Sequence, residues 1–159
     1  MVKTAKDSLT PKNIVGDLKR DFPGAFKSLE VTPREVVKGE LRREEILPVC
    51  LYLRDTLGFE HLSLISSIDW VSDFACMYHI TSYQHRVMCE LHVRIPKDDP
   101  SLESVTPVWK GAYVHEREAF DMMGIHFTNH PNLKRILLPE DYPYHPLRKD
   151  FPLEGKPYD

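Results

Sequence analysis

The sequence lacks long apolar runs: no stretch of its 159 residues approaches the ~20 apolar residues that a membrane-spanning helix needs. Its first residues, MVKTAKDSLTPKN, also lack the apolar region of a secretory signal peptide. A basic excess is missing as well, because 21 Lys and Arg stand against 24 Asp and Glu, for a net charge of −3. We therefore expect a chain that does not cross a membrane, is not secreted and does not bind nucleic acid.

Cysteine is scarce and catalytic motifs are missing. Cys50, Cys76 and Cys89 are odd in number and far apart, with no CxxC pair, which is typical of reduced, buried cysteines in a cytosolic protein. There is no glycine-rich phosphate loop, no GxSxG and no HExxH. His126 and His130 are four residues apart, but a glycine and a proline bracket them, which disfavours helical metal-ligand geometry. The sequence therefore indicates neither a metal site nor a catalytic nucleophile.

Apolar periodicity predicts a compact body over residues 1–127. Three helices are predicted, over residues 11–22, 43–57 and 107–123. Five strands are predicted, over residues 26–31, 34–41, 61–70, 74–83 and 86–95. Thr10-Pro11 and Thr106-Pro107 each read as a helix cap followed by a first-turn proline. Short joints between the last three strands favour antiparallel pairing, so the fold class is α+β with a mostly antiparallel sheet packed with three helices.

Residues 128–159 show no such periodicity, and proline is concentrated there. Of the 13 prolines, this segment holds Pro131, Pro139, Pro143, Pro146, Pro152 and Pro157, which forbid a long helix and discourage a central strand. The segment is nevertheless rich in leucine, isoleucine and aromatic residues. Two interpretations stay open: a tail that folds back over its own domain, or an extended C-terminal arm that wraps a partner protein.

The helix predicted over 107–123 carries a carboxylate in its apolar face. At about 100° per residue, Glu116 falls at the centre of the apolar stripe. Arg117 and Asp121 lie on its flank, and Glu118 lies on the opposite side. Because an unpaired buried charge is costly, Glu116 needs a cation or hydrogen-bond donors. It is either a core-edge residue that reaches water or a buried partner for a basic residue of the tail or of another subunit.

The charges of the tail come in blocks of neighbouring residues. These blocks are Lys134-Arg135, Glu140-Asp141 and Arg148-Lys149-Asp150. Blocks of alternating sign suit a specific protein surface better than a polyanion. Any one block taken alone is most often a solvated pair on the surface.

The most specific stretch of the sequence runs from the third predicted helix into the tail. EREAFDMMG at 116–124 is followed by HPNLKRIL at 130–137, PEDY at 139–142 and HPLRKDFPL at 145–153. This pattern resembles the diagnostic motif of the C subunit, the 30 kDa-type subunit, of respiratory complex I, the NADH–quinone oxidoreductase. With Ile68-Asp69-Trp70 and Thr106-Pro107, the resemblance covers roughly residues 60–155.

The resemblance implies a non-redox structural subunit in the peripheral arm of a membrane-bound, ion-translocating oxidoreductase that reduces a quinone or quinone-like carrier. It implies that this subunit binds no cofactor, and that FMN or FAD, iron–sulfur clusters and quinone belong to other subunits. The arm would wrap the adjacent D subunit, which forms the quinone site with the B subunit. As part of that membrane complex, this subunit would lie peripherally on the cytoplasmic side of the cell membrane. Because relatives use NADH, a reduced deazaflavin coenzyme or ferredoxin, the electron donor stays open.

The residues predicted to bind a partner fall on the third helix and along the arm, and none is assigned a catalytic role. Those on the helix, which would anchor the start of the arm, are Glu116, Arg117, Glu118 and Asp121. Those along the arm are His130, Lys134, Arg135, Glu140, Asp141, His145, Arg148, Lys149 and Phe151. The alternative function is a stand-alone protein-binding module whose tail closes on its own domain.

Overall fold

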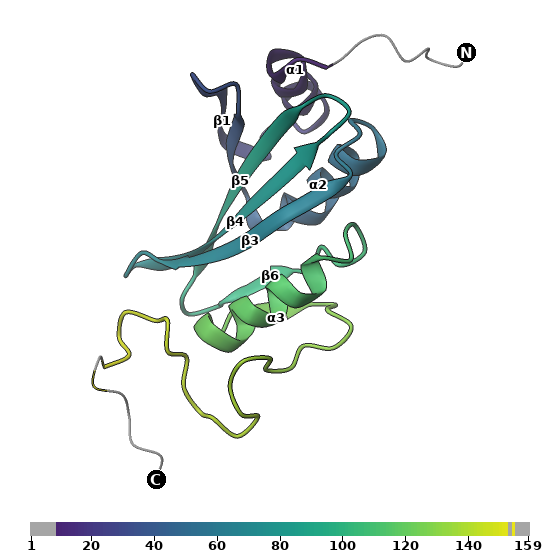
Figure 1. Ribbon diagram of the computed structural model, residues 1–159. Coiled ribbons are helices and arrows are strands. Elements are labelled where there is room, and N and C mark those ends of the chain that lie inside the picture. The colour runs from purple at the N-terminus through teal and green to yellow at the C-terminus, as the bar shows by residue number, and fades with distance from the viewer. Residues whose placement is uncertain (1–8, 153, 155–159) are drawn as a thin grey trace.

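The main sheet has five strands, and their order in the sheet differs from their order in the sequence (Figure 1). The computed structural model describes residues 9–152 and 154. The sheet runs in the order β1-β2-β5-β4-β3, with β2 and β5 parallel and the other neighbours antiparallel. Its strands are β1 (Phe26–Val31), β2 (Val37–Leu41), β3 (His61–Asp69), β4 (Asp73–Ser82) and β5 (Val87–Pro96). The predicted α+β class with a mostly antiparallel sheet is confirmed.

Three helices accompany this sheet within the described part of the chain. They are α1 (Pro11–Asp21), α2 (Ile46–Asp55), which the 3₁₀ turn η1 (Arg43–Glu45) precedes, and α3 (Ala112–Met123). α1 starts as predicted, because the Thr10 hydroxyl accepts a 3.2 Å hydrogen bond from the Asn13 N–H and Pro11 begins the first turn. η1 and α2 together replace the helix predicted over 43–57. Pro48 lies in the first turn of α2, where a missing N–H costs least.

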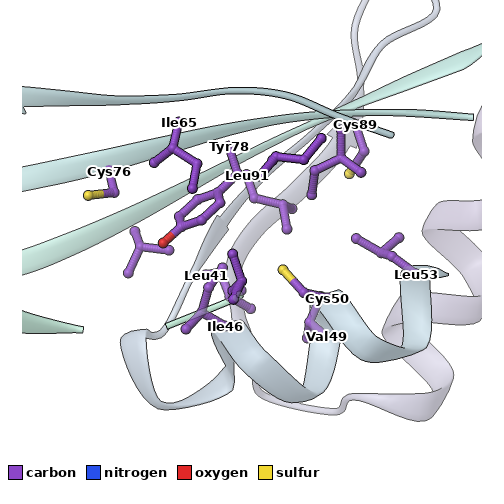
Figure 2. Close-up of a cluster of buried hydrophobic side chains, with 14 of the residues drawn as sticks. Leu41, Ile46, Val49, Cys50, Leu53, Ile65, Cys76, Tyr78, Cys89 and Leu91 are labelled. Atoms are coloured by element: carbon purple, nitrogen blue, oxygen red, sulfur yellow. The ribbon is translucent and has the colours of Figure 1, made fainter. Parts of the chain in front are cut away.

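The core lies between α2 and the sheet. Figure 2 shows Val49, Cys50 and Leu53 of α2 pointing toward Tyr78 and Leu91 of the sheet, and all five are buried. β5 turns alternate residues into this core, as its sequence predicts: Val87, Cys89, Leu91, Val93 and Ile95. The cysteines Cys50, Cys76 and Cys89 are buried and form no disulfide. Burial raises the pKa of each thiol, which keeps these cysteines unreactive.

The start predicted for the third helix, at residue 107, was wrong, because α3 begins at Ala112. Arg54 of α2 contacts this segment: its Nη1 donates to the carbonyl oxygens of Pro107 and Val108, both at 2.9 Å. In a helix starting at 107, these carbonyls would accept from N–H groups four residues further on. Instead, the N–H groups of Ala112 and Tyr113 bond the carbonyl oxygens of Trp109 and Lys110, three residues back, and the chain before Ala112 forms turns.

Two short strands beside α3 were not predicted. β6 (Ser101–Glu103) and β7 (His126–Thr128) pair in parallel as a separate two-stranded sheet. Each has three residues, which is too short for an alternating pattern to stand out. Residues 129–152, drawn from green to yellow in Figure 1, leave from β7; they first run along α3, and their yellow end turns away from it toward the end of β3.

Candidate subunit interface

Asp121, near the end of α3, is fully buried and binds the first half of the tail. Its Oδ2 accepts hydrogen bonds from the backbone N–H groups of Ile136, Leu137 and Leu138, at 3.0, 2.7 and 3.0 Å. Its Oδ1 accepts a 2.6 Å bond from the Arg135 guanidinium. Burial works to raise the pKa of Asp121, but these donors outweigh it and lower the pKa. An ionised carboxylate therefore fixes the path of residues 135–138.

The last carbonyl groups of α3 bind the second half of the tail. His145 Nδ1 donates to the Asp121 carbonyl oxygen at 3.0 Å, and the Leu147 N–H donates to that of Met122 at 3.1 Å. Arg148 Nε donates to the Met123 carbonyl oxygen at 2.7 Å. Carbonyl groups in the last turn have no partner within their helix, and a cation there also interacts favourably with the helix dipole. The tail thus caps α3 with its own side chains.

These two attachments make residues 135–148 a closed loop on the end of α3, which we call the docked loop. Arg135 Nη2 donates to the Tyr144 carbonyl oxygen at 3.1 Å, which ties one half to the other. The Tyr142 N–H donates to the Pro139 carbonyl oxygen at 3.1 Å and forms the turn at the tip. Compact loops whose ends meet are frequently functional.

Gly124 lies directly under the docked loop. It has φ of +73°, the left-handed conformation that ends α3. A Cβ at this position would lie 2.7 Å from His145 Nε2 and still closer to Arg148 Nη2. Only glycine meets both the conformational and the steric requirement.

We expect Gly124→Ala to loosen the docked loop and to lower the free energy of unfolding by about 1–2 kcal/mol, because it strains the left-handed residue and displaces two of the loop's attachments. Hydrogen exchange of residues 142–150 should accelerate, and urea unfolding should shift to lower concentration. The matched control is Gly16→Ala in α1, where the new methyl group meets open space. The control should be neutral or stabilising. Unchanged exchange in Gly124→Ala would contradict the packing described here.

Before the docked loop, the tail runs along α3. His130 Nε2 donates to the Tyr113 carbonyl oxygen at 3.1 Å, and His130 Nδ1 accepts the Asn132 N–H at 3.0 Å. Both ring nitrogens are engaged, which fixes the neutral tautomer, and burial lowers the pKa of His130. Arg117 Nε and Nη2 donate to the carbonyl oxygens of Lys134 and Arg135, at 3.0 and 2.8 Å.

Glu116 is fully buried on the inner face of α3. It does not reach water, so the core-edge interpretation was wrong. Its hydrogen-bond partners are two neutral donors, Ser104 Oγ at 2.6 Å and the Val105 N–H at 2.7 Å, so the expected basic partner from the tail was wrong as well. His130 from the tail lies farther off, with Nε2 4.0 Å from Oε2, and it is neutral. Burial outweighs the two hydrogen bonds and raises the pKa of Glu116 to about 7.

The structure separates the predicted partner-binding residues into two sets. Those whose side chains bond within the chain, at α3, are Glu116, Arg117, Asp121, His130, Arg135, His145 and Arg148. Those that are exposed are Glu118, Lys134, Glu140, Asp141 and Lys149, while Phe151 is half-buried with its ring 6.2 Å from that of Tyr144. Contact of either set with a partner stays a prediction.

Asp69 is an attachment point that the sequence does not predict. It is buried at the end of β3, and its Oδ2 accepts the Lys149 N–H at 2.9 Å across 80 positions of the chain. Lys97 Nζ lies 2.7 Å from Oδ1, and these partners lower the pKa of Asp69 to about 2 against its burial. The signal available in the sequence is the Ile68-Asp69-Trp70 stretch, which lies within the region of resemblance but by itself indicates no role.

The fold and these attachments define the class: an α+β domain that displays a proline-rich loop on its last helix. Among residues 9–152 and 154, no cluster of His, Cys, Asp and Glu side chains is arranged to hold a metal ion. In the same part of the chain, no helix is long and apolar enough to cross a membrane.

Comparison with known proteins identifies the family. The family described as "Respiratory-chain NADH dehydrogenase, 30 Kd subunit" matches residues 40–157. The C subunit of the NADH-quinone oxidoreductase of Nocardioides sp. is 39% identical over 167 residues, covering 89% of this chain and 67% of its own length. The C subunit of the F(420)H(2) dehydrogenase of Methanosarcina mazei is 36% identical over 149 residues, covering 92% and 93%. The chain belongs to the 30 kDa subunit family of respiratory-chain NADH dehydrogenases.

Two solved structures share the fold. A trypsin-resistant fragment of Nqo5 matches with a TM-score of 0.66 and 24% identity, covering 77% of this chain and 98% of the fragment. A chain of the membrane-bound sulfane sulfur reductase, an archaeal respiratory membrane complex, matches with a TM-score of 0.79 and 19% identity, covering 89% and 85%. At these identities the likeness concerns the fold alone.

Proposed function

We propose that this chain is a structural subunit in the peripheral arm of a complex I-type membrane-bound oxidoreductase, where its docked loop holds the adjacent quinone-site D subunit near the B subunit. Flavin, iron–sulfur clusters and the quinone-like acceptor are carried by other subunits, and the complex faces the cytoplasm. Membership of the 30 kDa family and relatives named as subunits of such enzymes support the assembly. Those relatives are C subunits of an NADH-quinone enzyme and of an F(420)H(2) enzyme. The proposal therefore concerns the structural role of the subunit and leaves the electron donor open.

The observation that carries the proposal is the exposure of two leucines on a loop that is otherwise firmly attached. Leu137 and Leu147 are 64% and 58% exposed, while the neighbouring backbone groups bond Asp121 and the end of α3. Holding apolar side chains in water contributes nothing to the stability of the isolated chain. It suits a preformed surface that a partner covers, because less ordering is then required on binding.

The test is co-purification of neighbouring subunits with the tagged full-length chain from detergent-solubilised membranes. We expect Leu137→Asp combined with Leu147→Asp to reduce recovery of the complex at least about tenfold, because two charges would enter an apolar contact. The same substitutions should leave the stability of the isolated chain nearly unchanged, since both side chains are exposed. Tyr83→Asp, at an exposed aromatic residue after β4, is the control.

The same experiment distinguishes the alternative function. The internal contacts of Arg135 and Arg148 also suit a tail that closes on its own domain. A stand-alone module would recover no neighbouring subunits, even as the wild-type chain. If the wild-type chain recovers them and the leucine variant does so equally well, the chain assembles through another surface. That result would overturn the proposed role of the docked loop.

A further inference from the structure

The turn between β3 and β4 carries an apolar tip that the proposed function does not explain. Trp70 and Val71 are 50% and 66% exposed at this tip. Val71 has φ of +75°, in the left-handed region. A β-branched residue is a genuine outlier there, because its Cβ substituents crowd the backbone. A glycine at this position would form the same turn without strain.

The surrounding structure holds this strained tip in place. Asp69 Oδ1 accepts the Val71 N–H at 2.8 Å, and the Trp70 N–H donates to the Asp73 carbonyl oxygen at 2.9 Å. The Arg94 guanidinium lies over the Trp70 ring, 5.2 Å from its centroid. Strain that neighbouring groups over-determine is a recurrent property of functional sites. The tip is therefore rigid as well as apolar.

The tip lies next to the docked loop, and Asp69 contacts both segments. Asp69, which binds the Val71 N–H, also binds the Lys149 N–H at 2.9 Å, directly after the loop. Arg148 lies over the ring of Phe74, 5.0 Å from its centroid, on the strand that follows the tip. Figure 1 shows the β3–β4 turn beside the yellow-green end of the tail. One protein surface can cover both.

We propose that Trp70 and Val71 form a second anchor for the same neighbouring subunit that receives the docked loop, and that they enter an apolar pocket on that subunit. The inference rests on the proposed function. Tryptophan is enriched among the side chains that dominate interface energies. A hollow of about 540 Å³ lies beside the turn and is lined by both basic and acidic side chains, among them Arg94, Lys97 and Asp98. It offers polar partners to groups that surround that pocket.

A protein partner fits these residues better than a lipid surface. Tryptophan with nearby lysine is also found at membrane interfaces. The exposed tip of the docked loop, however, carries Glu140 and Asp141. Because anionic lipids repel such a tip, the adjoining surface is favoured to meet protein.

The decisive variant is Val71→Gly in the full-length chain. It should raise the thermal midpoint of the isolated chain or leave it unchanged, because strain is removed, and yet reduce recovery of neighbouring subunits several-fold. Trp70→Ala should reduce that recovery at least about tenfold with little effect on the isolated chain. Tyr83→Ala is the control for loss of an exposed aromatic side chain. A purely structural role for Val71 predicts instead that stability and recovery change in the same direction.

The outcomes separate this inference from the proposed function. If the double leucine variant loses the complex while Trp70→Ala and Val71→Gly retain it, the second anchor is refuted and the docked loop stands. If none of these variants loses the complex, both fail. Flotation with phosphatidylglycerol–phosphatidylcholine vesicles should show no binding of the wild-type chain. Vesicle binding that Trp70→Ala abolishes would overturn the inference in favour of a lipid surface.

Discussion

Replacing Asp121 with alanine is expected to detach the docked loop and to lower the free energy of unfolding by about 3–5 kcal/mol. The substitution removes a fully buried carboxylate and leaves the guanidinium of Arg135 without its counter-charge. The N–H groups of Ile136, Leu137 and Leu138 lose their common acceptor at the same time. Urea unfolding measures the loss, and hydrogen exchange of residues 135–148 reports the detachment.

Two further variants make this result specific. Asp121→Asn keeps an acceptor oxygen but removes the charge, so its loss should be intermediate. Asp141→Ala removes an exposed carboxylate at the tip of the same loop, and its effect should stay within about 0.5 kcal/mol. If Asp121→Ala were as mild as Asp141→Ala, the tail would not depend on α3 in the way that its contacts indicate.

The second large effect is a pH dependence that Glu116→Gln should remove. In the unfolded chain the carboxyl has its ordinary pKa of 4.5, and in the fold burial raises the pKa to about 7. Between these values the folded state binds one more proton than the unfolded state, so the free energy of unfolding falls as pH rises. The loss is absent below 4.5, complete above about 7, and amounts to about 3 kcal/mol.

Glutamine can keep the hydrogen bonds of Glu116 without its titration. Its amide oxygen can accept the Val105 N–H, and its amide N–H can donate to Ser104. The pKa values of His130 and His145 are lowered from 6.5 by burial, which gives stability the opposite slope at pH values up to 6.5, a range that overlaps the window of Glu116. The difference between wild type and Glu116→Gln, measured by urea unfolding from about pH 4 to pH 8, therefore isolates Glu116. Parallel pH profiles for the two proteins would contradict its assignment.

Much of the body could be predicted because its signals are local. β5 alternates apolar and polar residues, so its buried face could be read from the sequence. A cap followed by proline marked the start of α1 correctly. The same pattern at Thr106-Pro107 misled: the chain there forms turns, and Arg54 of α2 donates to the carbonyl groups of Pro107 and Val108. That contact joins residues more than fifty positions apart, beyond the reach of any local pattern.

The candidate interface shows the same limit. The sequence identified Arg135 and Arg148 as charged residues of the tail, but their sign alone did not show that they face α3. Helical spacing marked Asp121 as a flank residue, whereas the returning chain buries it. The exposure of Leu137 follows from this return, because the backbone bonds to Asp121 decide which side chains point outward. The candidate interface is therefore defined by the return of the tail onto α3, which composition alone does not reveal.

Cross-linking of the intact, membrane-extracted complex tests the central claim most directly. Lys134 and Lys149 are exposed at the two ends of the docked loop and carry reactive amines, and Lys12 on α1 is an exposed reference. We expect an amine-reactive cross-linker to join Lys134 or Lys149 to a neighbouring subunit, with mass spectrometry identifying the joined peptides. Cross-links from both lysines confined to this chain, in a complex where Lys12 reacts normally, would contradict it.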